Sequence, residues 1–244
     1  MLAASDFDGT LSEIAVTPDA ARPVEGAAAA LAALARRPGW EVAIVSGREL
    51  RDLRSRCPVA SAWYIGSHGN QLAAPRGRKL FLPQVRLHPA ARAAALRLAR
   101  RWPQVWVEAK PVSVAWHYRQ APELEAEIRE QGHRLAARYG LRPLHGKCLL
   151  ELIAPGARDK GGAVAALARR LRPDAILYFG DDRTDETVFA LKLAPLLSVY
   201  LPPGRGEGRR RPRRGRHRWP TQAQYWLPGP QEVIQTLARL ARDY

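Results

Sequence analysis

Two acidic runs far apart in the sequence hold the residue types that could do chemistry. The first is Asp6–Leu11 and the second is Phe179–Glu186, and each follows a short apolar run that is typical of a buried strand. Because the carboxyl ends of parallel strands meet at one edge of a sheet, we expect the carboxylates to converge there. Convergent carboxylates stay ionised only beside a cation, so the pattern predicts a hard metal ion such as Mg²⁺. A metal ion beside an exposed aspartate can support phosphoryl transfer through an aspartyl-phosphate.

The segments around these runs alternate between strand and helix, as in a doubly wound parallel sheet. The predicted N-terminal elements are a strand at 1–5, a helix at 23–37, a strand at 41–45, a helix at 49–56 and a strand at 63–65. The C-terminal elements are a helix at 160–171, a strand at 175–179, a helix at 185–194, a strand at 196–200 and a helix at 231–242. The sequence therefore predicts an α/β fold with a Rossmann-like core.

A different pattern separates the two halves of this core. A helix followed by two strands is predicted twice, in 89–118 and in 122–153. Two such αββ units favour an antiparallel sheet with helices on one face. We therefore expect an inserted α+β cap domain at 83–155 and a catalytic core formed by 1–82 and 156–244.

The composition excludes several classes of protein. Hydrophobic residues make up 46% of the 244 residues, which is enough for a folded core, and no apolar run reaches the ~20 residues of a membrane span. The first residues lead directly into the acidic run, so we expect no signal peptide. The cysteines, Cys57 and Cys148, lack the spacing of a disulfide framework or a metal site. These features predict a cytoplasmic protein with reduced thiols.

The formal net charge of +16 invites a nucleic-acid hypothesis. The segment 204–218 holds eight arginines and one glutamate, and its Gly and Pro residues favour a solvated loop. The rest of the charge is dispersed, and no motif that reads DNA or RNA accompanies it. We therefore expect an anionic small molecule as the partner, rather than a nucleic acid or a membrane.

Four segments at predicted strand and helix ends resemble the motifs of the haloacid-dehalogenase-like (HAD) phosphatases. They are Asp6-x-Asp8, Ser46 after a strand, Lys160 at a helix start, and Asp181-Asp182 after a strand. Further stretches resemble the trehalose-6-phosphate phosphatase family, and the resemblance covers nearly the whole chain. These stretches are Ile14–Pro18, Val45–Arg48, Gly66–Gly69, Val107–Lys110, Ser113–Arg119, Gly146-Lys147 with Glu151, Lys160-Gly161, Phe179–Glu186 and Thr221–Leu227.

The resemblance implies catalytic roles for two core residues. Asp6 is expected to be the nucleophile, and Asp8 the general acid for the departing sugar alcohol and then the general base for water. Ser46, Gly47 and Lys160 are expected to bind the phosphoryl oxygens. The alternatives are structural: a capping turn for Asp6 and Asp8, a helix N-cap for Ser46, and a solvated first-turn position for Lys160.

The resemblance also implies the ligands of Mg²⁺. They are Asp6, the backbone carbonyl of Asp8, and Asp181. Asp182 and Asp185 are expected to orient these ligands through water or hydrogen bonds. Acidic residues at a helix start are also favoured by the helix dipole, so a purely structural role for Asp185 stays open.

The cap residues should select the substrate. A disaccharide presents hydroxyl groups, to which carboxylates and ammonium groups can bind. The resemblance implies that the sugar distal to the phosphate is bound by Glu108, Lys110, Lys147 and Glu151. His117 and Arg119 are expected to face the sugar, with a structural role as the alternative, and Asn70 is expected to reach the substrate. The alternative for the charged cap residues is a network of surface ion pairs on the sheet.

The resemblance as a whole implies hydrolysis of trehalose 6-phosphate to trehalose and phosphate, in trehalose biosynthesis, under a mobile cap. A phosphatase of sucrose phosphate or glycosyl-phosphoglycerate is an alternative, and a non-catalytic basic binding module is another. One departure from the family pattern is Ala154, where an arginine commonly precedes the proline. We expect no fused synthase domain and a separate trehalose-phosphate synthase that supplies the substrate.

Overall fold

In the computed structural model, residues 1–82 and 158–244 form one unit and residues 83–157 form another. The structure describes every residue except 16, 78–84, 147, 194, 203–220 and 244. The arginine-rich segment 204–218 and the predicted sugar ligand Lys147 therefore lie outside the described residues. Among the described residues, no helix has both the length and the apolar character needed to cross a membrane.

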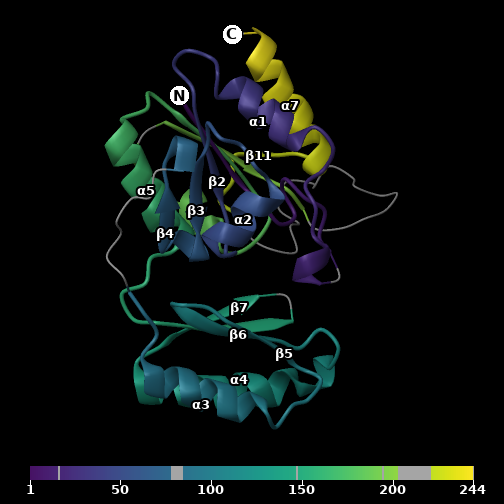
Figure 1. The fold of residues 1–244 in the computed structure, drawn as a ribbon, viewed down its shortest axis with the longest axis vertical. Helices are drawn as coiled ribbons and strands as arrows, with labels where there is room; N and C mark the ends of the chain where they lie inside the picture. The colour runs from purple at the N-terminus through teal and green to yellow at the C-terminus, as the bar shows by residue number, and fades with distance from the viewer. Residues whose placement is uncertain (16, 78–84, 147, 194, 203–220, 244) are drawn as a thin grey trace. The chain divides into compact units, whose positions relative to one another are not determined.

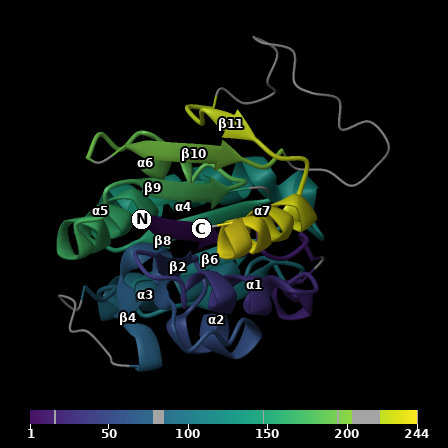
Figure 2. The ribbon, with the colours of Figure 1, turned by 90° about the horizontal axis from the view of Figure 1, so that it is seen from above.

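A seven-stranded sheet forms the centre of the first unit, in the order β11-β10-β9-β1-β2-β3-β4 (Figures 1 and 2). The strands are β1 (Leu2–Asp6), β2 (Glu41–Val45), β3 (Trp63–Gly66), β4 (Gln71–Ala73), β9 (Ile176–Gly180), β10 (Leu196–Tyr200) and β11 (Tyr225–Trp226). All pairs are parallel except β3 with β4. The register sets Asp6 opposite Val45 and Ser5 opposite Phe179, so the ends of β1, β2 and β9 meet at one edge.

Helices cover both faces of this sheet. One face buries α1 (Ala27–Leu34), α2 (Leu50–Arg56) and α7 (Pro230–Asp243), and α1 and α7 lie side by side (Figure 1). The other face buries α5 (Lys160–Leu171) and α6 (Glu186–Phe189). Because both faces are covered, β1 and β9 are buried along their whole length rather than at alternate residues. The short 3₁₀ helices are η1 (Pro18–Ala20), η2 (Ser67–Gly69), η3 (Pro75–Gly77) and, in the second unit, η4 (Pro122–Leu124).

The second unit is a four-stranded antiparallel sheet in the order β5-β6-β8-β7, with two helices on one face (Figure 1). Its elements are α3 (Pro89–Ala99), β5 (Trp106–Ala109), β6 (Ser113–His117), α4 (Glu125–Tyr139), β7 (Arg142–Gly146) and β8 (Leu149–Ile153). Alternate strand residues, including Val114, Trp116 and Leu150, point into the core against the helices. Among the described residues of this unit, no helix covers the opposite face of the sheet.

The predicted α/β fold class is confirmed, and two details of the elements are corrected. The helix predicted at 185–194 is wrong at its end, because α6 stops at Phe189. The carbonyl of Pro195 accepts a hydrogen bond from Ile176 N–H, so the chain must leave the helix to reach the sheet. The short edge strands β4 and β11 were not predicted.

Candidate active site

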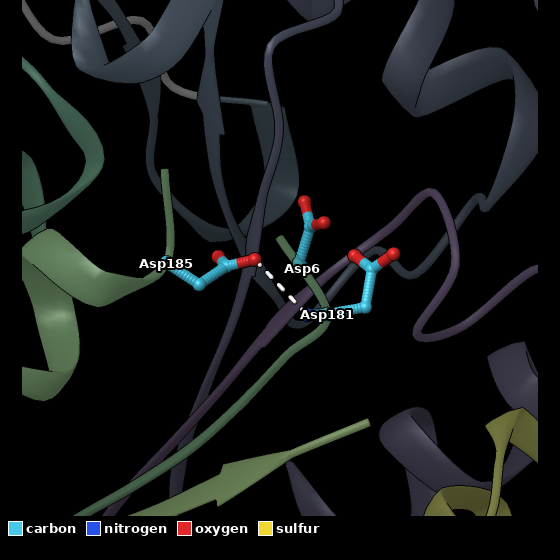
Figure 3. Close-up of side chains that lie close together, drawn as sticks. All are labelled: Asp6, Asp181 and Asp185. Carbon is cyan, nitrogen blue, oxygen red and sulfur yellow. Dashed lines mark hydrogen bonds between the residues drawn. The ribbon is translucent and has the colours of Figure 1, made fainter. Parts of the chain in front are cut away.

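Carboxylates from both acidic runs meet at the carboxyl edge of the large sheet. Asp6 is the last residue of β1, Asp181 follows β9, and Asp185 lies directly before α6. Each offers one carboxylate oxygen, and these three oxygens lie within 4.8 Å of one another (Figure 3). The carboxylates expected to meet at the ends of parallel strands are therefore Asp6, Asp181 and Asp185.

Lys160 supplies the positive charge of this group. Asp159 caps α5 by accepting a hydrogen bond from Gly162 N–H, which places Lys160 at the first position of the helix. Its Nζ lies 2.9 Å from Asp6 Oδ1 and 3.0 Å from Asp185 Oδ1, with the side chain 2% exposed. Burial alone would lower the pKa of Lys160, but Asp185 and Asp6 outweigh burial and raise that pKa well above its usual value. The ammonium group is therefore charged.

Asp185 is held from three directions. Its Oδ1 accepts a hydrogen bond from the Tyr178 hydroxyl at 2.7 Å. Its Oδ2 accepts from the backbone N–H groups of Asp181 and Asp182, and Figure 3 shows the bond from Asp181. The side chain is fully buried, and burial raises its pKa to about 6. These bonds fix the turn that follows β9, which fits the orienting role predicted for Asp185.

The site has too little positive charge for its carboxylates. Burial, followed by the neighbouring carboxylates, raises the pKa values of Asp6 and Asp181 well above the usual range. Asp182 is a fourth acid, 52% exposed, whose Oδ1 lies 3.8 Å from Lys160 Nζ. A divalent cation with a preference for oxygen ligands fits this excess of negative charge and this ligand set. The residues present therefore suit Mg²⁺, and Asp6, Asp181 and Asp185 are the side chains close enough together to surround one ion.

Asp8 is paired with Arg48 rather than with the other acids. Arg48 Nε and Nη2 each donate to one oxygen of the Asp8 carboxylate at 2.7 Å, which is a bidentate geometry. Arg48 Nη1 donates to Asp52 at 2.9 Å, and Asp52 also accepts from Arg56 at 2.8 Å. The two arginines lower the pKa of Asp52 against the opposing effect of burial. A chain of charged groups thus links the Asp8 carboxylate to α2.

The loop after β2 brings Ser46 and Gly47 to the same edge. Ser46 is 1% exposed, and its hydroxyl oxygen accepts the backbone N–H of Arg48 at 3.1 Å. Gly47 lies under the imidazole of His68, and a Cβ at Gly47 would come within 2.5 Å of that ring. His68 N–H in turn donates to the Ser46 carbonyl. The 67–69 turn therefore fixes the loop that was predicted to bind phosphate.

Asn70 joins this turn to the start of α5. Its amide Nδ2 donates to the carbonyls of Ser67 and Arg158, and its Oδ1 accepts from Arg158 N–H. These bonds position the chain two residues before Lys160. The substrate contact expected of Asn70 stays a prediction.

In the second unit, four of the predicted substrate-binding residues, Glu108, Lys110, His117 and Glu151, form a cluster on the helix-free face of the sheet. Lys110 Nζ lies 3.2 Å from Glu108 and 3.3 Å from Glu151, and His117 Nε2 lies 3.3 Å from Glu108 Oε2. Lys110 and Glu151 are both buried. The pKa of Lys110 is raised, because its two carboxylates outweigh burial. Arg119 lies in an exposed turn after β6.

Sequence reasoning gave no role to three residues of these sites. Arg48 was part of a family motif, and its spacing to Asp52 and Arg56 was a signal of i,i+4 pairing on a helix. Tyr178 lies in the apolar strand β9, and its sequence context indicated only a buried core residue. Ser113 donates a hydrogen bond of 2.5 Å to Glu151, and its position in an apolar strand gave no sign of this.

The fold and its acidic edge define a hydrolase-like α/β core of the HAD class. The structure is similar to a haloacid dehalogenase-like hydrolase from Bacteroides thetaiotaomicron, with 14% identity, 98% of each chain covered and a TM-score of 0.69. It is also similar to the C-terminal domain of C. albicans trehalose-6-phosphate phosphatase, with 22% identity, 100% of this chain and 93% of that chain covered, and a TM-score of 0.78.

The sequence narrows the class further. Residues 4–194 match the trehalose-phosphatase family, and the chain belongs to this family. It is 40% identical over 211 residues to the trehalose-phosphate phosphatase of Mycobacterium avium (strain 104), which covers 80% of this chain and 52% of that protein. The chain spans between 18% and 52% of the length of the curated relatives it matches.

Proposed function

We propose that the chain is a Mg²⁺-dependent phosphatase that hydrolyses trehalose 6-phosphate to trehalose and phosphate. The observation that supports this most is the buried Asp6 carboxylate at the end of β1, 2.9 Å from the Lys160 ammonium group. Membership of the trehalose-phosphatase family and the name of the M. avium relative support the choice of substrate. The first unit is proposed to be the catalytic core and the second to be the unit that recognises the sugar.

Asp6 is proposed to be the nucleophile. Its carboxylate oxygen attacks phosphorus, and the bond between phosphorus and the sugar oxygen breaks, which leaves an aspartyl-phosphate. Lys160 favours the ionised form of Asp6 and can attract phosphoryl oxygens. Ser46 accepts a bond from Arg48 N–H, so its own hydroxyl hydrogen is available for a phosphoryl oxygen.

Asp8 is proposed to move the proton. It protonates the departing sugar oxygen in the first step and accepts a proton from the attacking water in the second. The two hydrogen bonds from Arg48 fix the orientation of its carboxylate, and Asp52 fixes Arg48 in turn. A general acid must point at the reacting oxygen, so Arg48 is proposed as a positioning residue.

Mg²⁺ is proposed to be held by Asp6, Asp181 and the backbone carbonyl of Asp8, with Asp185 and Asp182 beside them. When bound, it supplies positive charge that offsets the charge of the phosphoryl group. Asp185 holds the turn before α6 through backbone N–H groups, so it orients Asp181 for this task.

The unphosphorylated sugar is proposed to bind to the cap cluster. Glu108 and Glu151 can accept hydrogen bonds from sugar hydroxyls, and Lys110 can donate to them. His117 lies on the same face, and Arg119 and Lys147 are proposed with it from the family pattern. A separate enzyme that transfers glucose to a sugar phosphate is proposed to supply the substrate.

The test is phosphate release from four substrates: trehalose 6-phosphate, sucrose 6-phosphate, glucose 6-phosphate and p-nitrophenyl phosphate. We expect a strong preference for trehalose 6-phosphate, which a chelator and the Asp6→Asn variant both abolish. Metal-dependent turnover of another substrate alone would refute the choice of sugar while keeping the core chemistry. No turnover of any substrate would refute the phosphatase proposal.

A further inference from the structure

The helix-free face of the cap sheet carries an exposed aromatic ring beside the charged cluster. Trp106 is 46% exposed, whereas Trp63, Trp102 and Trp116 are each below 10%. It is the only exposed one among the tryptophans that the structure describes. Trp106 begins the edge strand β5, and an exposed indole leaves apolar surface in contact with water, which is unfavourable unless a ligand covers it.

Strand register places this ring directly beside the cluster. Trp106 pairs with His117 across β5 and β6, and Glu108 pairs with Ala115. Ala115 pairs with Glu151 across β6 and β8. Since side chains alternate along a strand, all five residues point to the same face. An aromatic ring, two carboxylates and an imidazole are therefore neighbours on one surface.

The Trp106 ring packs against the ring of His117. The Trp106 and His117 rings lie 4.4 Å apart between centroids, with an angle of 48° between their planes. His117 is fixed on its other side by Glu108, at 3.3 Å. Glu108 is fixed in turn by Lys110. The ion-pair network thus anchors the aromatic surface through His117.

We propose that Trp106, supported by His117, is a stacking platform for the unphosphorylated pyranose ring of the substrate. A pyranose ring has apolar C–H faces and a rim of hydroxyls, so it matches an aromatic face with a carboxylate at its edge. Glu108 lies two residues along the same strand and can accept hydrogen bonds from the rim. Trp106 is then a specificity-determining residue for disaccharide phosphates over monosaccharide phosphates. This inference rests on the function proposed above.

The first test measures binding without turnover, in the Asp6→Asn background, by calorimetry with trehalose 6-phosphate and with glucose 6-phosphate. We expect Trp106→Ala to raise the dissociation constant of trehalose 6-phosphate about tenfold, because ring stacking contributes up to ~1.5 kcal/mol. Trp106→Phe should restore most of the affinity. Glucose 6-phosphate lacks the second ring, so its binding should not change. The matched control is Tyr225→Ala, which removes a 58% exposed aromatic side chain on β11 and should change neither ligand.

A second readout reports on the ring itself. Trehalose 6-phosphate should shift the tryptophan emission of Asp6→Asn to shorter wavelength, and Trp106→Phe in the same background should remove the shift. In the active enzyme, Trp106→Ala should raise KM for trehalose 6-phosphate with kcat within about threefold, and leave p-nitrophenyl phosphate turnover unchanged.

Three outcomes overturn the proposal. Equal losses for the disaccharide and the small substrates mean that Trp106 supports the fold of the cap. Unchanged affinity in Trp106→Ala means that the ring does not touch the sugar, and a change only in oligomeric state means that it contacts a second copy of the chain. In the last two cases the proposed function still stands if the wild-type protein hydrolyses trehalose 6-phosphate. If it does not hydrolyse or bind that compound, the proposed function fails first and the platform with it.

Discussion

Replacement of Lys160 by methionine should show how much the charge of Lys160 contributes to the stability of the folded protein. The substitution keeps most of the side-chain volume and removes the charge. Nζ lies 2.9 Å from Asp6 and 3.0 Å from Asp185, and each contact is worth about 5.5 kcal/mol of Coulomb energy at an effective dielectric constant of ~20. Part of this is offset by the cost of burying the ammonium group, so we expect a loss of about 3–5 kcal/mol in the free energy of unfolding.

The loss should depend on pH in a definite direction. Burial raises the pKa of Asp185 to about 6 even with Lys160 present, and without the lysine that pKa must be higher. An acid with a raised pKa binds its proton more tightly in the folded state, so stability falls as pH rises from the unfolded pKa to the folded one. The penalty of Lys160→Met should therefore be much larger at pH 8 than at pH 5. Mg²⁺ should also reduce it at pH 8, by replacing the missing positive charge.

The assay is urea denaturation followed by fluorescence, at pH 5 and pH 8, with and without Mg²⁺. The control is Lys192→Met, the same substitution at an exposed lysine, which should stay within about 0.5 kcal/mol of wild type. A loss below about 1 kcal/mol at pH 8, or an equal loss at both pH values, would show that Lys160 acts through its apolar stem rather than its charge.

Two other substitutions test how the site is positioned. Arg48→Met should lower kcat for trehalose 6-phosphate on the order of 100-fold with a small change in KM, because Asp8 loses both hydrogen bonds that orient it. Arg48→Lys should not restore kcat, since an ammonium group cannot bind Asp8 in a bidentate manner. If the lysine variant recovers kcat in steady-state assays, Arg48 does not act by positioning Asp8. Gly9→Ala should weaken the activation of turnover by Mg²⁺ about tenfold or more, because a Cβ at this residue would overlap the Asp181 carboxylate. The variant should also be less stable, because an alanine at φ +83° adds about 1–2 kcal/mol of backbone strain. The control is Gly39→Ala, at φ +79° with no atom within 4 Å of the added Cβ. In thermal unfolding it should lose stability from backbone strain, and in the Mg²⁺ titration it should behave like the wild type.

Much of the core could be predicted because each signal is local. Strand β2, helix α5 and strand β10 begin and end at the predicted residues, Glu41–Val45, Lys160–Leu171 and Leu196–Tyr200. Apolar runs bounded by turn residues mark the strands, and Asp159 marks the helix start as an N-cap. Strands of two or three residues such as β4 and β11 have no such periodic signal, so they were missed.

The side-chain contacts could not be predicted in the same way. Arg48 reaches Asp8 across 40 residues of sequence, and Lys110 reaches Glu151 across 41. Both contacts depend on strand register, which a single sequence does not give. The exposure of Trp106 could not be predicted from the sequence either, because the residue types of a strand alternate in the same way whether its outer face meets water or a ligand.

The charge distribution of the first unit explains why one protein can be basic overall and yet need a cation locally. The formal net charge of +16 favours the approach of an anionic substrate over long distances. At the sheet edge, however, Lys160 is the one cation that contacts Asp6 and Asp185 among the described ion pairs, while Asp181 and Asp182 add further negative charge. A phosphate monoester brings close to two more negative charges to this point. Its binding beside Asp6 is therefore unfavourable until a divalent cation is present, so the metal ion and the phosphate should bind cooperatively, each lowering the electrostatic cost of the other.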